Sequence, residues 1–347
     1  MKKIAILLSL LLMVSVLPAC SNDSGKTVLN VYNWGEYIDE SIFDDFEAQY
    51  PDIKINYETY PENETMYTKI TSGQAVYDIL FPSDYMISRL IAEGMLAKLN
   101  FDNIPNYSLI DEKYKNMDFD PNNEYSVPYM WGTLGIFYDK TKVSEKTFSW
   151  ELLFSDKYKN DILMKNDVRD ALGVALCSQG YSFNSTNPAE LEKAKNKLVA
   201  QKDVILGRVG DEGMDKMIAG EAALALMYSG DAAYCISENP DLAFAIPEET
   251  TNLFFDSMVI PASSPNKEIA EKFINFMCET EIALRNCEEI GYSTPHTGAF
   301  EELDADVKNS FAYPTAERLE DTEVYVYLGQ EGTQLYDKVW TEYLASF

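Results

Sequence analysis

The chain has 347 residues, with 28 lysines and arginines against 57 aspartates and glutamates, and so a formal net charge of −29. Nucleic acids and anionic lipid surfaces are bound through basic surfaces, so this balance argues against both as partners and favours a cationic ligand. A single histidine, His296, argues against serine or cysteine hydrolase chemistry and against a zinc site.

The start of the chain has the pattern of a bacterial secretion signal. Lys2 and Lys3 precede a short apolar run, and small residues lead to Cys20. The run is too short to cross a bilayer comfortably as a helix. It resembles a lipoprotein signal, so we expect removal of a signal peptide over 1–19, lipidation of Cys20 and a flexible tether over 20–27. The mature protein would lie outside the cytoplasm, held at the bacterial cell membrane by lipid alone, on a periplasmic face or an open cell surface.

Strands and helices are predicted to alternate in the first third of the chain. Apolar residues recur at helical spacing after Asp39, which serves as the expected N-cap, up to the stop at Pro51. The predicted elements are a strand over 28–32, a helix over 39–50, a strand over 53–57, a helix over 64–72, a strand over 77–81 and a helix over 84–92.

The same alternation returns in the middle of the chain. It predicts an α/β fold with a largely parallel sheet, in two lobes joined by short crossings. The predicted elements are a strand over 161–164, a helix over 167–179, a strand over 222–228, a strand starting within 257–261 and a helix over 267–278.

Four cysteines remain after the signal, and they lack the CxxC or other spacing of a metal site. We expect small buried apolar groups at these positions and leave their pairing open. They are Cys177, Cys235, Cys278 and Cys287.

Aromatic and acidic residues follow several predicted strands, where ligands of open α/β sheets bind. They stand at 33–37, 82–85, 166–170, 228–231 and 254–256. Carboxylates and ring faces suit an alkyl ammonium, because a buried charge needs a partner and each cation–π contact contributes on the order of 0.5–2 kcal/mol. Taken singly, each residue could equally cap a helix or pack a core. The residues alone therefore indicate a two-lobed α/β lipoprotein that binds a cation.

Seven segments resemble the substrate-binding lipoproteins of spermidine/putrescine ABC transporters, over nearly the whole mature chain. They are 31–37 (VYNWGEY), 63–67 (NETMY), 77–83 (YDILFPS), 119–123 (FDPNN), 126–132 (SVPYMWG), 255–261 (FDSMVIP) and 290–295 (IGYSTP). The resemblance implies a monomer without cofactor or catalysis, which binds a polyamine and delivers it to ABC permease subunits served by a cytoplasmic ATPase.

The resemblance also implies a two-lobed periplasmic binding protein fold, type II-like, with the ligand cleft between the lobes. Two crossing strands, near 129–133 and 254–256, would form the hinge. The expected boundaries are 28–131 with 255–305 for lobe 1, and 132–254 with 306–347 for lobe 2.

Twelve ligand-binding positions follow from the resemblance. Trp34 and Tyr37 would flank the polyamine chain, and Asp256 would hold an inner amine. Asp170 replaces a residue that is often glutamate in the family. The remaining implied positions are Glu36, Ser83, Tyr85, Asp167, Tyr228, Asp231, Phe254 and Tyr292.

Some positions depart from the family pattern and leave the preferred polyamine open. Tyr228 stands where well-known members have tryptophan. Phe254 stands where spermidine-selective members often have tryptophan. Tyr325 aligns with a position late in the chain where family members carry a side-chain amide. Asp231 resembles the arrangement in putrescine-selective relatives. With more acids than amines, one acid should pair with Arg169 or meet the ligand through water.

Two other functions stay open on the residues. A receptor of the same fold could bind a metal ion, thiamine or a sugar, although His296 lacks companions for an iron site. A surface glycosidase could use Asp167 and Asp170, which stand three apart at a helix start. Competition by polyamines, and turnover of glycosides, would separate these functions.

Overall fold

The computed structural model describes residues 25–346, so the predicted signal peptide and Cys20 lie outside the described residues. Within 25–346, no helix has the length and apolar character that a membrane span requires. The strands are β1 (Thr27–Trp34), β2 (Ile53–Tyr60), β3 (Ile79–Leu80), β4 (Ser126–Asp139), β5 (Ile162–Lys165), β6 (Gly207–Val209), β7 (Leu224–Tyr228), β8 (Leu242–Ala245), β9 (Thr251–Val259) and β10 (Thr322–Glu323).

Helices cover both faces of the sheet. The α-helices are α1 (Ile42–Gln49), α2 (Asn63–Thr71), α3 (Asp84–Ala92), α4 (Val168–Cys177), α5 (Pro188–Gln201), α6 (Glu212–Ile218), α7 (Ser229–Glu238), α8 (Lys267–Met277), α9 (Thr280–Ile290), α10 (Thr297–Glu302), α11 (Ala305–Lys308), α12 (Ala316–Leu319) and α13 (Gly329–Leu344). Short 3₁₀ helices lie at Phe101–Asn103, Pro105–Leu109, Glu112–Tyr114, Trp150–Phe154 and Asp156–Tyr158.

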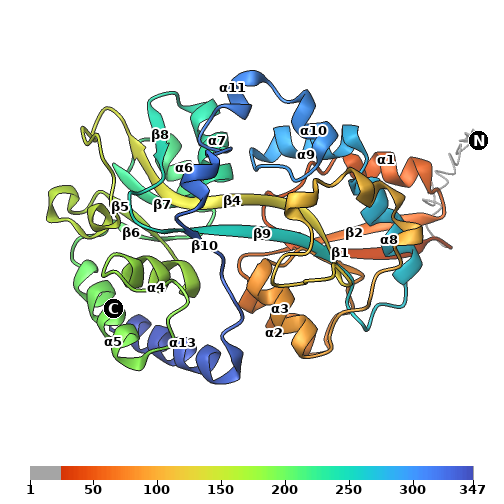
Figure 1. Ribbon diagram of the computed structural model, residues 1–347, viewed down its shortest axis with the longest axis horizontal. Coiled ribbons are helices and arrows are strands. Elements are labelled where there is room, and N and C mark those ends of the chain that lie inside the picture. Colours follow the sequence, from red (N-terminus) through yellow and green to blue (C-terminus); the bar gives the residue numbers. More distant parts are fainter. Residues whose placement is uncertain (1–24, 347) are drawn as a thin grey trace, which may run out of the picture.

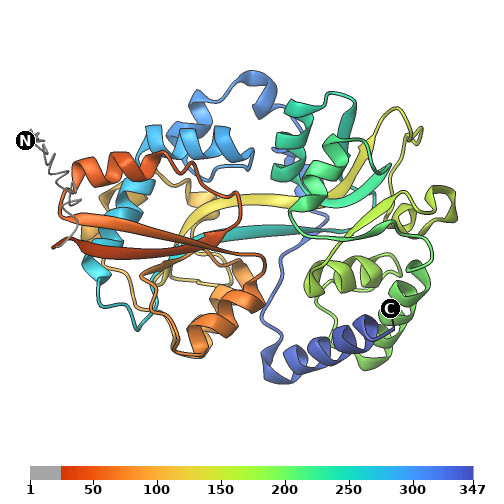
Figure 2. The same cartoon turned by 180° about the vertical axis from the view of Figure 1, so that it is seen from behind.

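Two lobes share one mixed sheet, whose strand order is β2-β1-β3-β9-β4-β7-β5-β6. The first lobe is built on β1, β2 and β3, with α2 and α3 on one face and α1 and α8 on the other (Figure 1). The second lobe is built on β5, β6 and β7, with α4, α5 and α13 on one face and α6 and α7 on the other, as the reverse view also shows (Figure 2). This is the two-lobed α/β fold that the sequence predicts.

The long strands β4 and β9 run side by side through the middle of the molecule and link the lobes (Figure 1). They contain the two crossings predicted near 129–133 and 254–256, with Met130 paired to Asp256 and Gly132 to Phe254. The sheet is parallel within each lobe, as expected, but β9 is antiparallel to both β3 and β4, and β4 is antiparallel to β7. The sheet is therefore mixed, because the two crossing strands run in opposite directions.

Several predicted elements need correction at their ends. Asp39 does not cap α1, because the helix begins at Ile42. The Asp39 carboxylate instead accepts hydrogen bonds from Ser41 and forms an ion pair with Arg285. Strand β3 keeps only two of the five predicted residues, and β9 begins at Thr251, well before the predicted start. In each case a tertiary contact, unseen in local periodicity, decides the boundary.

Helices α3 and α4 hold the residues of the site in place. Helix α3 has the predicted bounds and buries Met86, Ile87 and Leu90. Asp167 caps α4 by accepting from the backbone N–H groups of Arg169 and Asp170, the N-cap geometry that satisfies free donors of the first turn. Every residue of α4 is buried, because α5 and α13 pack over its outer face.

Candidate functional site

A cavity of about 470 Å³ lies between the two lobes and is lined by side chains from both. All twelve positions implied by the resemblance line it, together with Tyr325. Some of these residues lie at or just after the ends of β1, β5 and β7. Others lie at the start of α3 or just after α9, and Phe254 and Asp256 belong to the central strand β9. The carboxyl ends of parallel strands thus meet at the cavity, as the sequence predicts for an open α/β sheet.

Asp256 is the most buried acid of the central strands, with 4% of its surface exposed. Its Oδ2 accepts a hydrogen bond of 2.7 Å from the Tyr37 hydroxyl. Its Oδ1 is buried and finds no partner among residues 25–346. Burial raises the pKa of Asp256 to about 6, against the lowering effect of the nearby Ser83 and Tyr37 hydroxyls. A buried oxygen without a donor marks the place where an external donor would be stabilised most.

Asp170 belongs to the first turn of α4 and is also buried. Both of its oxygens accept from tyrosine hydroxyls, Oδ2 from Tyr228 and Oδ1 from Tyr325 at 3.1 Å. Burial, together with the charge of Asp167, raises the pKa of Asp170 to about 7. Tyr325 therefore serves as a hydroxyl donor to this acid.

Asp231 and Tyr292 join the two lobes across the cavity. The Tyr292 ring belongs to the apolar core of the first lobe, whereas Asp231 lies in the first turn of α7 in the second lobe. The Tyr292 hydroxyl donates to Oδ1 of Asp231 over 2.5 Å. The same ring packs on Gly230, where an added Cβ would lie 2.0 Å from a ring atom. The two lobes are therefore closed on one another at this point.

Aromatic rings form the walls of the cavity. Tyr37 meets Tyr292 edge to face with ring centroids 4.7 Å apart, and Phe254 meets Tyr228 at 5.0 Å. Trp34 packs on Tyr60 and donates its indole N–H to the Phe81 carbonyl oxygen over 2.7 Å. Such hydrogen bonds and edge-to-face packing fix the rings in place. Ring faces and carboxylates together suit an alkyl chain that carries ammonium groups.

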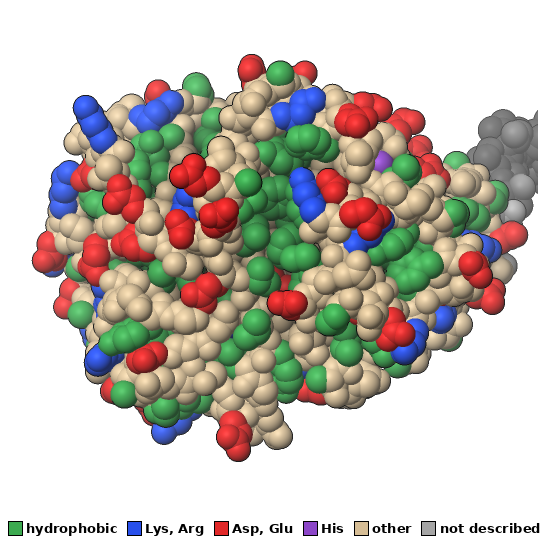
Figure 3. All heavy atoms as spheres, viewed as in Figure 1, with side chains coloured by type: hydrophobic (Ala, Val, Ile, Leu, Met, Phe, Trp, Pro, Cys, Tyr) green, Lys and Arg blue, Asp and Glu red, His purple; other side chains and the backbone are tan. Residues whose placement is uncertain are grey.

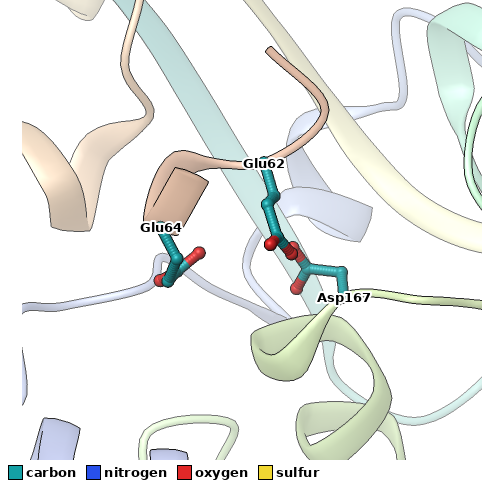
Figure 4. Close-up of side chains that lie close together, drawn as sticks. All are labelled: Glu62, Glu64 and Asp167. Atoms are coloured by element: carbon teal, nitrogen blue, oxygen red, sulfur yellow. The ribbon is translucent and has the colours of Figure 1, made fainter. Parts of the chain in front are cut away.

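Three carboxylates lie close together where the two lobes meet (Figure 4), and one of them, Asp167, lines the cavity. Glu62 and Glu64 come from the start of α2 in the first lobe, and Asp167 comes from the start of α4 in the second; their oxygens lie within 4.8 Å of one another. Burial, and then the charge of Asp167, raises the pKa of Glu64 to about 7. Oxygen ligands of this kind could hold a hard cation or an ammonium group. Of these three acids only Asp167 is among the predicted positions, although Glu64 lies within one of the seven resembling segments.

Of the two arrangements expected for a surplus acid, an ion pair with Arg169 or a contact with the ligand through water, the ion pair is not formed among the described residues. The Arg169 guanidinium donates to Oδ1 of Asn184 over 2.8 Å and lies over the rings of Tyr85 and Tyr325, with 4.9 and 4.5 Å to the ring centroids. Within the described part of the chain, the hydrogen bonds of this guanidinium go to Asn184 and to the Val326 carbonyl oxygen, and not to Asp167 or Asp170. Arg169 thus packs the aromatic wall, and the acids stay available to a ligand.

Four charged residues of the cavity lining were missed from the sequence: Glu40, Lys165, Asp211 and Glu289. Lys165 ends β5, directly before the predicted motif, and Asp211 follows β6. A three-residue strand such as β6 carries no readable periodicity, so the residues after it gave no signal. Lys165 could have been found, because it stands at the same strand end as Asn166 and Asp167.

The cysteines and the histidine lie apart from this chemistry. All four cysteines of the described chain are buried and unpaired, as expected for small apolar groups. His296 is the N-cap of α10: its Nδ1 accepts from the Ala299 backbone N–H, and its Nε2 lies 3.0 Å from the Cys278 carbonyl oxygen. His296 is absent from the cavity lining. Its role is structural.

The outer surface differs from the cavity wall. On the face shown in Figure 3, acidic side chains are spread over both lobes, whereas hydrophobic side chains gather at the middle, where the lobes meet. This distribution agrees with the net charge of −29. A field of this sign attracts cationic ligands over long range.

The fold and the cleft define a solute receptor. The chain belongs to the family of bacterial extracellular solute-binding proteins, whose profile matches residues 41–315. The spermidine/putrescine-binding periplasmic protein of Escherichia coli is 34% identical over 308 residues, which cover 88% of each chain.

Two solved structures share the fold at high identity. A protein assigned to a spermidine/putrescine ABC transporter of Listeria monocytogenes has 40% identity and a TM-score of 0.89, over 92% of this chain and 99% of that one. The spermidine/putrescine ABC transporter substrate-binding protein of Streptococcus pneumoniae has 39% identity and a TM-score of 0.78 over the same shares.

Proposed function

We propose that this protein is the extracytoplasmic substrate-binding component of a polyamine ABC importer, which captures a polyamine between its lobes and hands it to the permease without catalysis. The observation that carries the proposal is the buried Oδ1 of Asp256, which has no partner among residues 25–346 and lies in a cavity walled by aromatic rings. The names of the E. coli, L. monocytogenes and S. pneumoniae relatives support the same ligand class.

In this proposal the ligand lies along the cavity as an extended alkyl chain. One ammonium group donates to Asp256, and Trp34, Tyr37 and Phe254 cover the methylenes. Acids from α4 and α2 hold another ammonium group. Because the contacts come from both lobes, the ligand favours the closed form over the open one.

The proposal extends to segments outside the cavity. Lipidation at Cys20 anchors a monomer to the membrane, and the lobe boundaries are those expected from the resemblance, with exchange between lobes near 131 and 255. Replacement of Cys20 by alanine should move the protein from the membrane fraction to the soluble extracytoplasmic fraction. If the C20A chain stayed in the membrane fraction, the lipid anchor would be wrong.

The direct test is calorimetric titration of residues 22–347 with putrescine, cadaverine, spermidine and spermine, after unfolding and refolding to strip carried-over ligand. We expect one-to-one binding of at least one polyamine. An uncharged diol of the same chain length as putrescine is the control, and it should not bind. If none of the four amines binds, the cavity serves another solute and the proposal is wrong.

A further inference from the structure

A lysine side chain lines this acidic cavity. Lys165 is the last residue of β5, and its Nζ lies 3.8 Å from the centroid of the Tyr228 ring. Tyr228 is part of the aromatic wall and donates to Asp170. The ammonium group of Lys165 thus occupies the face of a ring that a ligand ammonium would otherwise use.

The charged residues of the cavity fall into two groups: those on which the charge of Lys165 acts, and those on which it does not. Burial raises the pKa values of Asp211 and Asp231, and the positive charge of Lys165 partly offsets this increase. The charge of Lys165 also acts to lower the pKa of Asp170, whereas the charge of Asp167 acts to raise it. This region of the cavity therefore contains acids and a cation of its own.

In the other region the cation is Arg169, whose guanidinium donates to Asn184 and lies over the rings of Tyr85 and Tyr325, not beside an acid. The largest effects on the pKa of Glu64 are burial and the charge of Asp167, and both raise it. The pKa of Asp256 is raised by burial, and its Oδ1 is without a partner in residues 25–346. Of these acids, Asp256 and Asp167 line the cavity, so cationic groups of a ligand are most stabilised between these two residues.

We infer that Lys165 is a specificity-determining residue: its ammonium group supplies the positive charge beside Asp211 and Asp231, and it leaves room in the cavity for two ligand ammonium groups. The inference rests on the proposed polyamine function and names the ligand subclass. Diamines are favoured, because the third or fourth ammonium of a longer polyamine would meet Lys165 at close range and be repelled.

The test compares putrescine with spermidine by calorimetry on the parent and on Lys165→Met, which keeps the length of the stem and removes the charge. We expect the parent to bind putrescine more tightly. In K165M the affinity for spermidine relative to putrescine should rise by about tenfold or more, the size expected for removal of one close like charge. Lys165→Arg keeps the charge over the ring and should keep the parent's order of preference.

A matched control separates this effect from net charge. Lys272 on α8 also lies over a tyrosine ring, Tyr50, at 5.9 Å, but it is exposed and outside the cavity lining. Lys272→Met should leave the ratio of the two affinities unchanged. Thermal unfolding of each variant confirms that it folds.

A second substitution tests whether Asp231 is the acid that binds the additional ammonium group once the charge of Lys165 is removed. Asp231→Asn should remove most of the gain in spermidine affinity in the K165M background, measured relative to the effect of Asp231→Asn alone. If K165M binds polyamines with the parent's ratio, this inference is overturned and the proposed function stands. If neither protein binds any polyamine, both are overturned.

Discussion

Tyr37 and Asp256 stand 219 residues apart in the chain, yet the Tyr37 hydroxyl donates a hydrogen bond of 2.7 Å to Oδ2 of Asp256. The bond holds the carboxylate in one orientation, so that Oδ1 stays buried and without a partner among the described residues. A carboxylate fixed in this way is prepared for a cation before the cation arrives, which lowers the ordering cost of binding.

Replacement of Asp256 by asparagine should therefore abolish tight binding. Loss of one partner of a buried charge pair costs about 2–5 kcal/mol, so calorimetry should show polyamine affinity weakened by roughly 30-fold to several thousand-fold. Without ligand, the variant should unfold at no lower temperature than the parent, because a costly buried charge has been removed. The exposed Asp241 gives the control, and Asp241→Asn should bind as the parent does. Equal affinity of D256N and the parent would contradict the role of Asp256.

Trp34 tests the contribution of the ring walls. Trp34→Ala should cost about 1–3 kcal/mol of binding through lost stacking and cation–π contact. It should also lower the unfolding temperature, because the Tyr60 contact and the hydrogen bond to Phe81 are lost. Trp34→Phe keeps a ring and should recover a large part of the affinity but not the hydrogen bond. If W34A binds as tightly as the parent, Trp34 is a packing residue only.

The acids of the cavity predict a specific dependence on pH. Burial raises the pKa of Asp256 to about 6 and those of Asp170 and Glu64 to about 7. These groups hold their protons more firmly folded than unfolded, so their contribution to the stability of the ligand-free protein is present at low pH and is lost as the pH rises from about 4 to 7.

Polyamine affinity should change in the opposite direction, because the ligand needs ionised carboxylates. The increase in unfolding temperature on adding polyamine should be small at pH 5 and large at pH 8, as measured by differential scanning fluorimetry at both pH values. In D256N the step in affinity near pH 6 should be reduced. An increase in unfolding temperature that does not vary with pH would show that these acids do not contact the ligand.

Closure of the lobes can be tested at Gly230, whose place against the Tyr292 ring leaves no room for a Cβ. Gly230→Ala should force the ring away and separate Tyr292 from Asp231, so that the closed form is penalised while each lobe still folds. Small-angle scattering with ligand should show a larger radius of gyration than the parent, and affinity should fall. Gly207→Ala is the matched control, since nothing lies within 4 Å of its added Cβ. A G230A protein as compact as the parent with ligand would show that closure does not depend on this contact.

Local pattern decides some elements of this fold and not others. Helix α3 has the predicted bounds because its apolar side chains recur at helical spacing, whereas β3 is cut to two residues by its pairing with β1 and β9. The placement of the twelve implied positions at the cavity could be predicted, because eleven of them stand in the aromatic and acidic segments at 33–37, 82–85, 166–170, 228–231 and 254–256, and Tyr292 stands in a resembling segment. Asp211 could not be predicted, because it follows a strand too short to show a pattern and reaches the cavity through tertiary packing alone.

The position of β9 in the sheet has a consequence for how the protein is made. Strand β3 pairs on one side with β1, and its other neighbour is β9, which ends at Val259. A chain that leaves the ribosome N-terminus first therefore exposes an unpaired strand edge until most of its length has been synthesised. The sheet of the first lobe is therefore completed only by a strand from the last third of the chain, so this lobe cannot complete its fold as an early, independent unit.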